Sequence, residues 1–276
     1  MVIKVLHVGL GPIGTAVVRQ VAARKGMQIV GAVDADPANV GRDLGAVSGM
    51  RRKLGVVVGA DIMKAIKTAR PDIAVICLDA SLKDVLPQFE QVLKLKVPIV
   101  STTPELVYPA LAHRAMAKKI DALARRSRVA VFGAGAHAGF AMDVLPIALT
   151  AACAKVDAID VRRVESAPAN DGALGLAESV AMIADAVGWK LDAIEAGVGS
   201  LKGKVRVRLR VEHDAAAEPH TTIHITGTPS LTAVLSGIHG EVTTAAMTVN
   251  AIPKVLAAQP GLRTMKDMVL PSYFGG

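Results

Sequence analysis

The chain has 276 residues, 51% hydrophobic and 20% charged, with 32 Lys and Arg against 24 Asp and Glu and hence a formal net charge of +8. The length predicts two domains or one large one, and the composition excludes a disordered polyelectrolyte. Because the basic residues are scattered and only 3% of the chain is aromatic, the charge favours a solvated surface or an anionic cofactor over a nucleic-acid partner.

The first 133 residues alternate strand and helix patterns. Short β-branched runs predict strands, and longer stretches with apolar residues at helical spacing predict helices. We expect strands at residues 3–8, 28–33, 73–78, 98–101 and 129–132, and helices at residues 15–24, 61–70, 83–95 and 109–126. This order predicts a parallel, doubly wound Rossmann sheet with right-handed crossovers in an α/β fold.

A glycine-rich turn, GLGPIG, lies between the first strand and the first helix. In this G-x-G-x-x-G motif, Gly9 permits the tight turn, Gly11 lets the backbone approach a pyrophosphate, and Gly14 lets helix and strand pack closely. Pro12 and Ile13 open the helix, whose N-terminal N–H groups and partial positive charge suit phosphates. The motif predicts dinucleotide binding; a Rossmann-like fold without a ligand is the alternative.

Asp34 ends the second predicted strand, 20 residues after Gly14. A carboxylate there accepts hydrogen bonds from the ribose hydroxyls and repels a 2′-phosphate, which favours NAD over NADP. Arg42, Arg51 and Arg52 follow closely, so use of NADP stays open.

Later strand ends supply further candidates, because open α/β sheets bind ligands at the carboxyl edge of their strands. We expect Leu78, Ser101 and Thr102 to contact the cofactor. In the segment STTPELVY, Glu105 is suited to transferring a proton or holding a cation. The alternative is an exposed carboxylate in the first turn of a helix that follows Pro104.

The segment GAGAHAGF marks a change of pattern after residue 133. Glycines there let the backbone pass close to a cofactor or turn sharply between domains. His137 is a candidate donor to the nicotinamide amide or the substrate, and Ala138 a candidate cofactor contact. A structural histidine that caps the following helix is the alternative for His137.

The rest of the chain predicts an α+β domain. In GKVRVRLRVEH, basic and aliphatic residues alternate, which predicts an antiparallel strand with one buried and one wetted face; an oligomer interface is the alternative role of the basic face. We expect helices at residues 138–154, 176–187 and 243–256, a strand at residues 158–164, and further strands within residues 220–237. The last helix is expected to pack on the first domain.

No metal site is expected. His220 and His224 are four residues apart in a strand-like segment, where that spacing covers about 13 Å, too far for one metal ion. His239 either points into a cleft or is a solvent-facing loop histidine.

The chain also has the features of a cytoplasmic protein. Cys77 and Cys153 lie far apart, which excludes a disulfide scaffold and fits a reducing compartment. The first residues, MVIKVLHVGLGPIG, lack a signal-peptide pattern. No apolar run approaches the roughly 20 residues of a membrane span, so we expect no membrane partner.

Four segments resemble the 2,4-diaminopentanoate dehydrogenase family, which includes the native amine dehydrogenases and shares its N-terminal domain with dihydrodipicolinate reductases. They are the glycine motif, STTPELVYP, GAGAHAGFAMDVLPIALTAAC and TTAAMTVNAIPKVLAAQPGLRTMKDM. The resemblance implies an NAD(P)-dependent enzyme with a Rossmann domain, an α+β substrate domain and usually a homodimer. Family members interconvert an amine with a carbonyl compound plus ammonia, through an imine that accepts hydride at carbon.

The resemblance gives Glu105 the role of holding the ammonium or iminium nitrogen and relaying its proton. Three departures from the family pattern stand out. Pro104 replaces the first glutamate of the family's TCEELSYP-like pattern, and His137-Ala138 replaces Asn-Pro beside the nicotinamide. Between residues 164 and 176 the chain has only ESAPANDGALG, where relatives carry a long basic and aromatic insertion, which predicts a more open pocket. The His-His…Lys signature of dihydrodipicolinate reductases is absent.

The sequence therefore predicts an NAD(P)-dependent oxidoreductase acting on a C–N bond of a small amine, ketone or imine. A carbonyl or imine reductase that needs no free ammonia is one alternative, and a non-catalytic dinucleotide-binding sensor or scaffold is another. The expected domains are a dinucleotide-binding domain over residues 1–133, a substrate and dimerisation domain with a mostly antiparallel sheet over residues 134–242, and a returning helix and tail over residues 243–276.

Overall fold

The computed structural model describes residues 2–166 and 175–275, which form two compact units. The first unit comprises the chain up to Leu106, His113–Gly135, and the chain from Glu241 onward; the second comprises Val107–Ala112 and Ala136–Gly240. The backbone of His137 is described, whereas its side chain is not.

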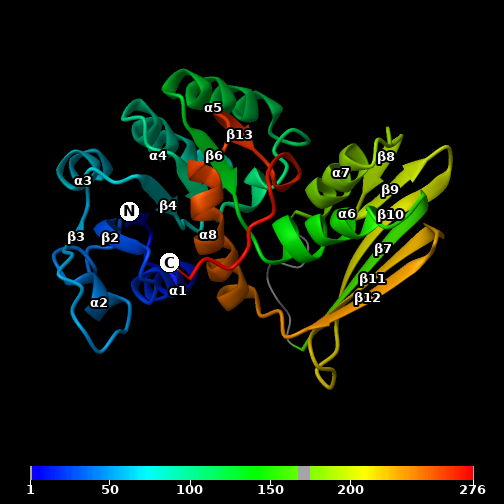
Figure 1. Ribbon diagram of the computed structural model, residues 1–276, viewed down its shortest axis with the longest axis horizontal. Helices are drawn as coiled ribbons and strands as arrows, with labels where there is room; N and C mark the ends of the chain where they lie inside the picture. The colour runs from blue at the N-terminus through cyan, green and yellow to red at the C-terminus, as the bar shows by residue number, and fades with distance from the viewer. Residues whose placement is uncertain (1, 167–174, 276) are drawn as a thin grey trace. The chain divides into compact units, whose positions relative to one another are not determined.

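The first unit is built on a parallel sheet (Figure 1). Within the described residues, seven strands follow the order β13-β6-β5-β4-β1-β2-β3, and all neighbours are parallel. The strands are β1 Ile3–Val8, β2 Met27–Val33, β3 Val58–Gly59, β4 Ile73–Ile76, β5 Ile99–Ser101, β6 Ala130–Gly133 and β13 Gly261–Arg263. The chain runs outward from β1 to β3 and then returns to β4 beside β1, so the predicted doubly wound Rossmann sheet is confirmed.

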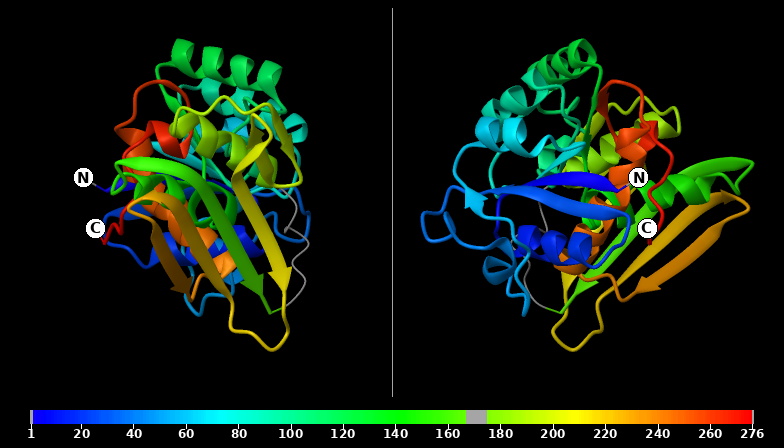
Figure 2. Two further views of the ribbon diagram at one scale, coloured as in Figure 1. Left: turned by 90° about the vertical axis from the view of Figure 1, so that its right-hand side faces the viewer. Right: turned by 60° about the vertical axis from the view of Figure 1, so that its left-hand side comes forward.

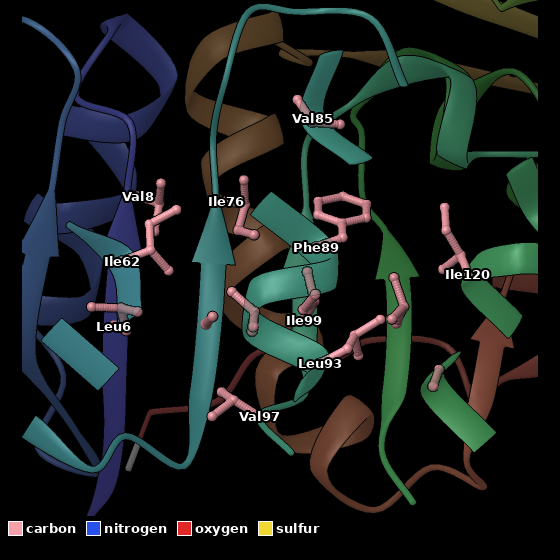
Figure 3. Packing of buried hydrophobic residues seen from close by; sticks show 14 of the residues in the cluster. Leu6, Val8, Ile62, Ile76, Val85, Phe89, Leu93, Val97, Ile99 and Ile120 are labelled. Carbon is pink, nitrogen blue, oxygen red and sulfur yellow. The ribbon is translucent and has the colours of Figure 1, made fainter. Parts of the chain in front are cut away.

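The first unit also contains helices. They are α1 Pro12–Ala22, α2 Leu44–Val47, α3 Ile62–Ala69, α4 Leu82–Lys94, α5 Arg114–Ser127 and α8 Gly240–Leu256. Figure 3 shows the core between the sheet and α3, α4 and α5, where Leu6 and Ile76 of the strands pack with Ile62, Phe89 and Ile120 of the helices. All five side chains are buried, which accounts for the aliphatic pattern of the sequence.

Side chains mark where several helices begin. Asp61 caps α3 by accepting the N–H of Lys64, and the hydroxyl of Ser81 caps α4. The expected helix at residues 109–126 begins later, at Arg114. The helix start thus coincides with the return of the chain to the first unit, because Val107–Ala112 belongs to the second unit and His113–Gly135 to the first.

The second unit is built on a mixed sheet, whose strands lie side by side in Figure 2. The described strands follow the order β12-β11-β7-β10-β9-β8, and α6 Val144–Thr150 and α7 Leu176–Ala186 contact them. Their bounds are β7 Lys155–Glu165, β8 Ala193–Glu195, β9 Val198–Leu201, β10 Lys204–His213, β11 His220–Thr228 and β12 Leu231–Ser236. Antiparallel pairs predominate, as expected.

The expectation for the basic strand, β10, is half right. It is antiparallel to β9 but parallel to β7. Alternation reports which face of a strand is buried and carries no information on direction. The chain between β7 and β10 includes α7, β8 and β9, long enough for the crossover that a parallel pair needs.

The expected continuous helix at residues 138–154 is wrong. A π-type turn spans His137–Ala141, with non-helical backbone angles at Ala138 and with Gly139 at φ +98°, and regular helix begins only at Val144. Gly139 adopts a left-handed conformation that favours glycine. The apolar pattern continues across this break because the turn is buried as well.

Candidate functional site

The glycine-rich loop follows β1 and opens α1. Gly9 has φ +91°, and a Cβ there would collide with the carbonyl oxygen of Cys77. A Cβ on Gly14 would collide with the carbonyl oxygen of Gly9. At Gly11, in contrast, no described atom beyond Gly11 itself and its two chain neighbours lies within 4 Å of the Cβ position. Two glycines therefore let the loop close, and the third borders open space.

That open space adjoins the start of α1. Gly11 is the N-cap residue and Pro12 follows at the first helical position, where the missing N–H of proline is not needed. The first-turn N–H groups, beginning with Ile13, have no intrahelical acceptors, and the helix dipole adds partial positive charge there. These residues fit the pyrophosphate of a dinucleotide.

Asp34 lies beside the glycine-rich loop at the end of β2. Its Oδ2 accepts the N–H of Leu10 at 2.6 Å, and its Oδ1 accepts the N–H of Asp36 at 2.7 Å. Carboxylate oxygens have further lone pairs, so the group is still able to accept hydrogen bonds from ribose hydroxyls.

The nearby arginines differ in their surroundings. Arg42 donates to the carbonyl oxygen of Ala38, within the loop that follows β2. Arg52 donates to the carbonyl oxygen of Ala22 at the end of α1, and the preceding Arg51 is exposed. Of these three arginines, Arg42 is the nearest in sequence to Asp34, the residue that would contact the adenosine ribose.

The ends of β4 and β5 add the next predicted residues. Leu78 follows β4, and its Cδ2 lies 3.0 Å from the Cβ position of Gly9, against the loop. The N–H of Thr102 donates to the carbonyl oxygen of Ile76. Ser101 is fully buried, with its hydroxyl 3.0 Å from that of Thr103, so it shapes the strand end from inside.

Glu105 lies in a single turn of 3₁₀ helix, Pro104–Leu106, after β5. It is half-buried, whereas Leu106 is fully buried and occupies the position that a Cβ on Gly133 would need. Buried Leu106 thus anchors the turn and holds Glu105 at the carboxyl edge of the sheet, in the same unit as the glycine-rich loop and Asp34.

His137 and Ala138 belong to the second unit. The His137 side chain lies outside the described residues, as do residues 167–174 of the shortened segment. The Cβ of Ala138 is 3.1 Å from the Cβ position of Gly175, so these two segments of the second unit are in contact. The predicted donor role of His137 remains a prediction.

Asp143 organises the segment that carries His137. It is fully buried, and its carboxylate accepts the N–H groups of Gly139 and Val144 and the hydroxyl of Ser179, at 2.6–2.7 Å. Burial raises the pKa of Asp143 to about 6, although the three hydrogen bonds favour the charged form.

Sequence reasoning also missed two buried basic side chains, His7 and Arg163. His7 in β1 is 0% exposed and its Nε2 is 2.8 Å from the carbonyl oxygen of Gly9; burial lowers its pKa to about 4. Arg163 in β7 is 1% exposed and donates to Glu165, to Thr221 and to the backbone. The sequence does carry a signal for His7, because a histidine stands inside the otherwise mostly apolar strand IKVLHV.

The histidines of β11 have local partners. Nδ1 of His220 is 2.8 Å from the carbonyl oxygen of Glu218, and Nδ1 of His224 is 2.9 Å from the hydroxyl of Thr232. In residues 2–166 and 175–275, no group of three or more His, Cys, Asp or Glu side chains is arranged to hold a metal ion. In the same ranges, no helix has the length and apolar character needed to cross a membrane.

Comparisons with known proteins match both parts of the chain. Residues 3–134 match the family model of the dihydrodipicolinate reductase N-terminus, and residues 195–276 match that of the 2,4-diaminopentanoate dehydrogenase C-terminal domain. The 2,4-diaminopentanoate dehydrogenase of Acetoanaerobium sticklandii is 28% identical, over 99% of this chain and 95% of that enzyme. An amine dehydrogenase of Streptomyces virginiae is 27% identical over 55% of this chain and 42% of its own length.

A solved structure has the same fold. The amine dehydrogenase from Mycobacterium smegmatis superposes with a TM-score of 0.83 at 22% identity, covering 99% of this chain and 98% of that one. The fold is therefore shared over nearly all of the chain.

Proposed function

We propose that the chain is a member of the 2,4-diaminopentanoate dehydrogenase family, whose C-terminal domain model and a 28% identical relative it matches, and that it interconverts a small amine with the corresponding carbonyl compound and ammonia. One observation carries this proposal. The glycine-rich loop, Asp34 and Glu105 follow the carboxyl ends of β1, β2 and β5 in one parallel sheet, the edge at which such sheets bind ligands.

The residues of this edge fit a dinucleotide. The open space at Gly11 and the start of α1 would hold the pyrophosphate, and Asp34 would accept the ribose hydroxyls. When bound, the nicotinamide supplies or accepts hydride at the substrate carbon. We propose NAD as the preferred cofactor, because the carboxylates of Asp34 and exposed Asp36 would repel the 2′-phosphate of NADP.

Glu105 is the proposed proton-transfer residue. As a carboxylate it attracts the ammonium ion and takes a proton from it when the C–N bond forms. It then returns a proton to the hydroxyl that leaves as water, which produces the iminium carbon that accepts hydride. The half-buried setting of Glu105 strengthens its attraction for a cation compared with bulk water.

The proposal is tested by mixing the purified protein with NADH or NADPH and a panel of aldehydes and ketones, with and without ammonium. Oxidation of the reduced nicotinamide that depends on ammonium supports the proposal. Oxidation without ammonium would instead assign a carbonyl reductase. Cofactor binding with no turnover of any substrate would contradict an enzymatic role in this chemistry.

A variant pair tests the role of Glu105. Glu105→Gln removes the charge and the proton acceptor, so we expect a loss of at least about a hundredfold in turnover with cofactor affinity retained. The matched control is Glu218→Gln, which changes an exposed carboxylate in a loop of the second unit. Equal turnover in the two variants would remove Glu105 from the mechanism.

We further propose a homodimer formed through the exposed face of the second sheet. On this face Arg208 and Arg210 pair with Asp160, and Val234 in β12 is 65% exposed. Mixed charges around an apolar side chain suit a self-complementary contact. Light scattering should give a dimer mass, and Val234→Glu should give a monomer.

We also propose a cytoplasmic location, consistent with the free thiols of Cys77 and Cys153.

A further inference from the structure

One peptide group of the glycine-rich loop is held from both sides by side chains. The carbonyl oxygen of Gly9 lies 2.8 Å from Nε2 of His7, and the N–H of Leu10 donates to Oδ2 of Asp34 at 2.6 Å. This carbonyl and this N–H belong to the same planar peptide unit. The two hydrogen bonds therefore fix the orientation of that plane.

The ring of His7 lies beneath the loop. It is 0% exposed, and its Nε2 is also 3.1 Å from the position that a Cβ on Gly14 would take. A carbonyl oxygen only accepts hydrogen bonds, so Nε2 carries the proton. Nδ1 is buried with no hydrogen-bond partner among the described residues, and burial lowers the pKa of His7 to about 4. The ring is thus neutral, and it donates one hydrogen bond, from Nε2 to the carbonyl oxygen of Gly9.

The hydrogen bonds run from His7 through the Gly9–Leu10 peptide to Asp34, whose carboxylate they orient. Oδ2 is engaged by Leu10 and Oδ1 by the N–H of Asp36, which fixes the plane of the carboxylate. The remaining lone pairs then point in set directions. If the Gly9–Leu10 peptide rotates, the N–H of Leu10 leaves Asp34 and the carboxylate loses one of its two anchors.

We propose that His7 is a positioning residue for the dinucleotide: through the Gly9–Leu10 peptide it orients the Asp34 carboxylate toward the ribose. His7 does not need to touch the cofactor, because hydrogen bonds in such a chain polarise and orient one another. The inference rests on the dinucleotide site of the proposed function.

Two polar substitutions test whether the hydrogen-bond donor at the position of His7 Nε2 matters, or only the presence of a polar side chain at residue 7. The amide nitrogen of His7→Gln reaches about as far as Nε2, whereas that of His7→Asn is too short. NADH binding, followed by nicotinamide fluorescence, should weaken about tenfold in His7→Asn and less than about threefold in His7→Gln. Thermal unfolding of each variant checks that both are folded, and equal affinities in the two variants would overturn the inference.

A double-mutant cycle with Asp34→Ala shows whether His7 acts through Asp34. In the Asp34→Ala background, His7→Asn should weaken NADH binding by less than about twofold, because the group that it orients is gone. A full tenfold loss in that background would show a general structural effect and contradict the inference. Absence of NADH binding by the unmodified protein would instead reject the proposed function itself.

Discussion

The carboxylate of Asp143 accepts a 2.7 Å hydrogen bond from the hydroxyl of Ser179, in the interior of α7. The same carboxylate caps α6 at Val144 and holds Gly139 in the π-type turn. One buried charge therefore connects two helices and the turn that carries His137, which gives the segment a fixed shape within the second unit.

Removing this charge should destabilise the second unit. Asp143→Ala leaves two backbone N–H groups and a hydroxyl without their acceptor, and we expect a loss of about 2–4 kcal/mol in unfolding free energy. Ser179→Ala removes only one of the bonds and should cost about 1 kcal/mol. Trp189, the single tryptophan of the chain, lies in the second unit, so its fluorescence in a urea titration measures both. Equal losses would show that Ser179 is the only important partner.

The two units should respond to acid in opposite ways. The folded-state pKa of His7 is about 4, below its ordinary value of 6.5, so between these values the unfolded chain binds more protons. The stability that His7 contributes to the first unit is complete above pH 6.5 and is lost as the pH falls toward 4. The loss amounts to at most about 3 kcal/mol.

For Asp143 the sign is reversed. Its folded-state pKa is about 6, above its ordinary value of 3.8, so its contribution is complete below pH 3.8 and is lost as the pH rises through 6. Hydrogen exchange, corrected for intrinsic rates, should show β1 losing protection between pH 6.5 and 4.5 relative to α6 and α7. Parallel loss of protection in both units would contradict these assignments.

Two alanine substitutions in the glycine-rich loop should have different consequences. Gly11→Ala places a methyl group in open space, so the protein should fold normally, but NADH affinity should fall at least about tenfold because the methyl group occupies the pyrophosphate position. Gly14→Ala drives a methyl group into the backbone of Gly9 and should cost about 2 kcal/mol or more in stability. Thermal unfolding and NADH titration of both variants separate these effects. Unchanged NADH affinity in Gly11→Ala would reject the phosphate position.

Adjacent arginines provide a matched pair in β7. Arg163 is 1% exposed and pairs with Glu165, whereas Arg162 pairs with Glu212 at the surface. Arg163→Ala removes a buried guanidinium and its hydrogen bonds to the buried residues Thr221 and Ile238 and should cost about 3–5 kcal/mol; Arg162→Ala should cost less than about 1 kcal/mol. Urea unfolding followed by Trp189 fluorescence compares them. Similar costs would mean that burial of Arg163 adds nothing to its importance.

Local sequence signals predicted five strands of the first sheet, β1, β2, β4, β5 and β6, but neither the two-residue β3 nor the edge strand β13. The glycine motif and Asp34 follow their strands as expected because strand runs, turn residues and helical spacing are encoded within short windows. The turn before α6 was not predicted, because it depends on the left-handed backbone of Gly139 and on a carboxylate, Asp143, that contacts a helix distant in sequence. The parallel pairing of β10 with β7 was not predicted either, because the alternation of basic and aliphatic residues along a strand does not reveal the direction of its neighbours.

The roles of single buried polar residues were also beyond sequence reasoning. The sequence shows that His7 interrupts an apolar strand, but only the structure shows that its ring meets the carbonyl group of Gly9. For Glu105 the local turn follows from Pro104, whereas its half-buried position depends on Leu106 packing against Gly133. Such contacts are tertiary and leave no periodic pattern.

The edge strand β13 pairs with β6, yet Ala136–Gly240, the larger segment of the second unit, lies between them in the chain. During synthesis from the N-terminus, β6 is therefore made long before the strand that covers its edge. The second unit is complete and free to fold while that edge is still open to other chains. Synthesis of β13 then completes the first sheet, so the residues of the inserted unit are made before the last strand of the unit that surrounds it.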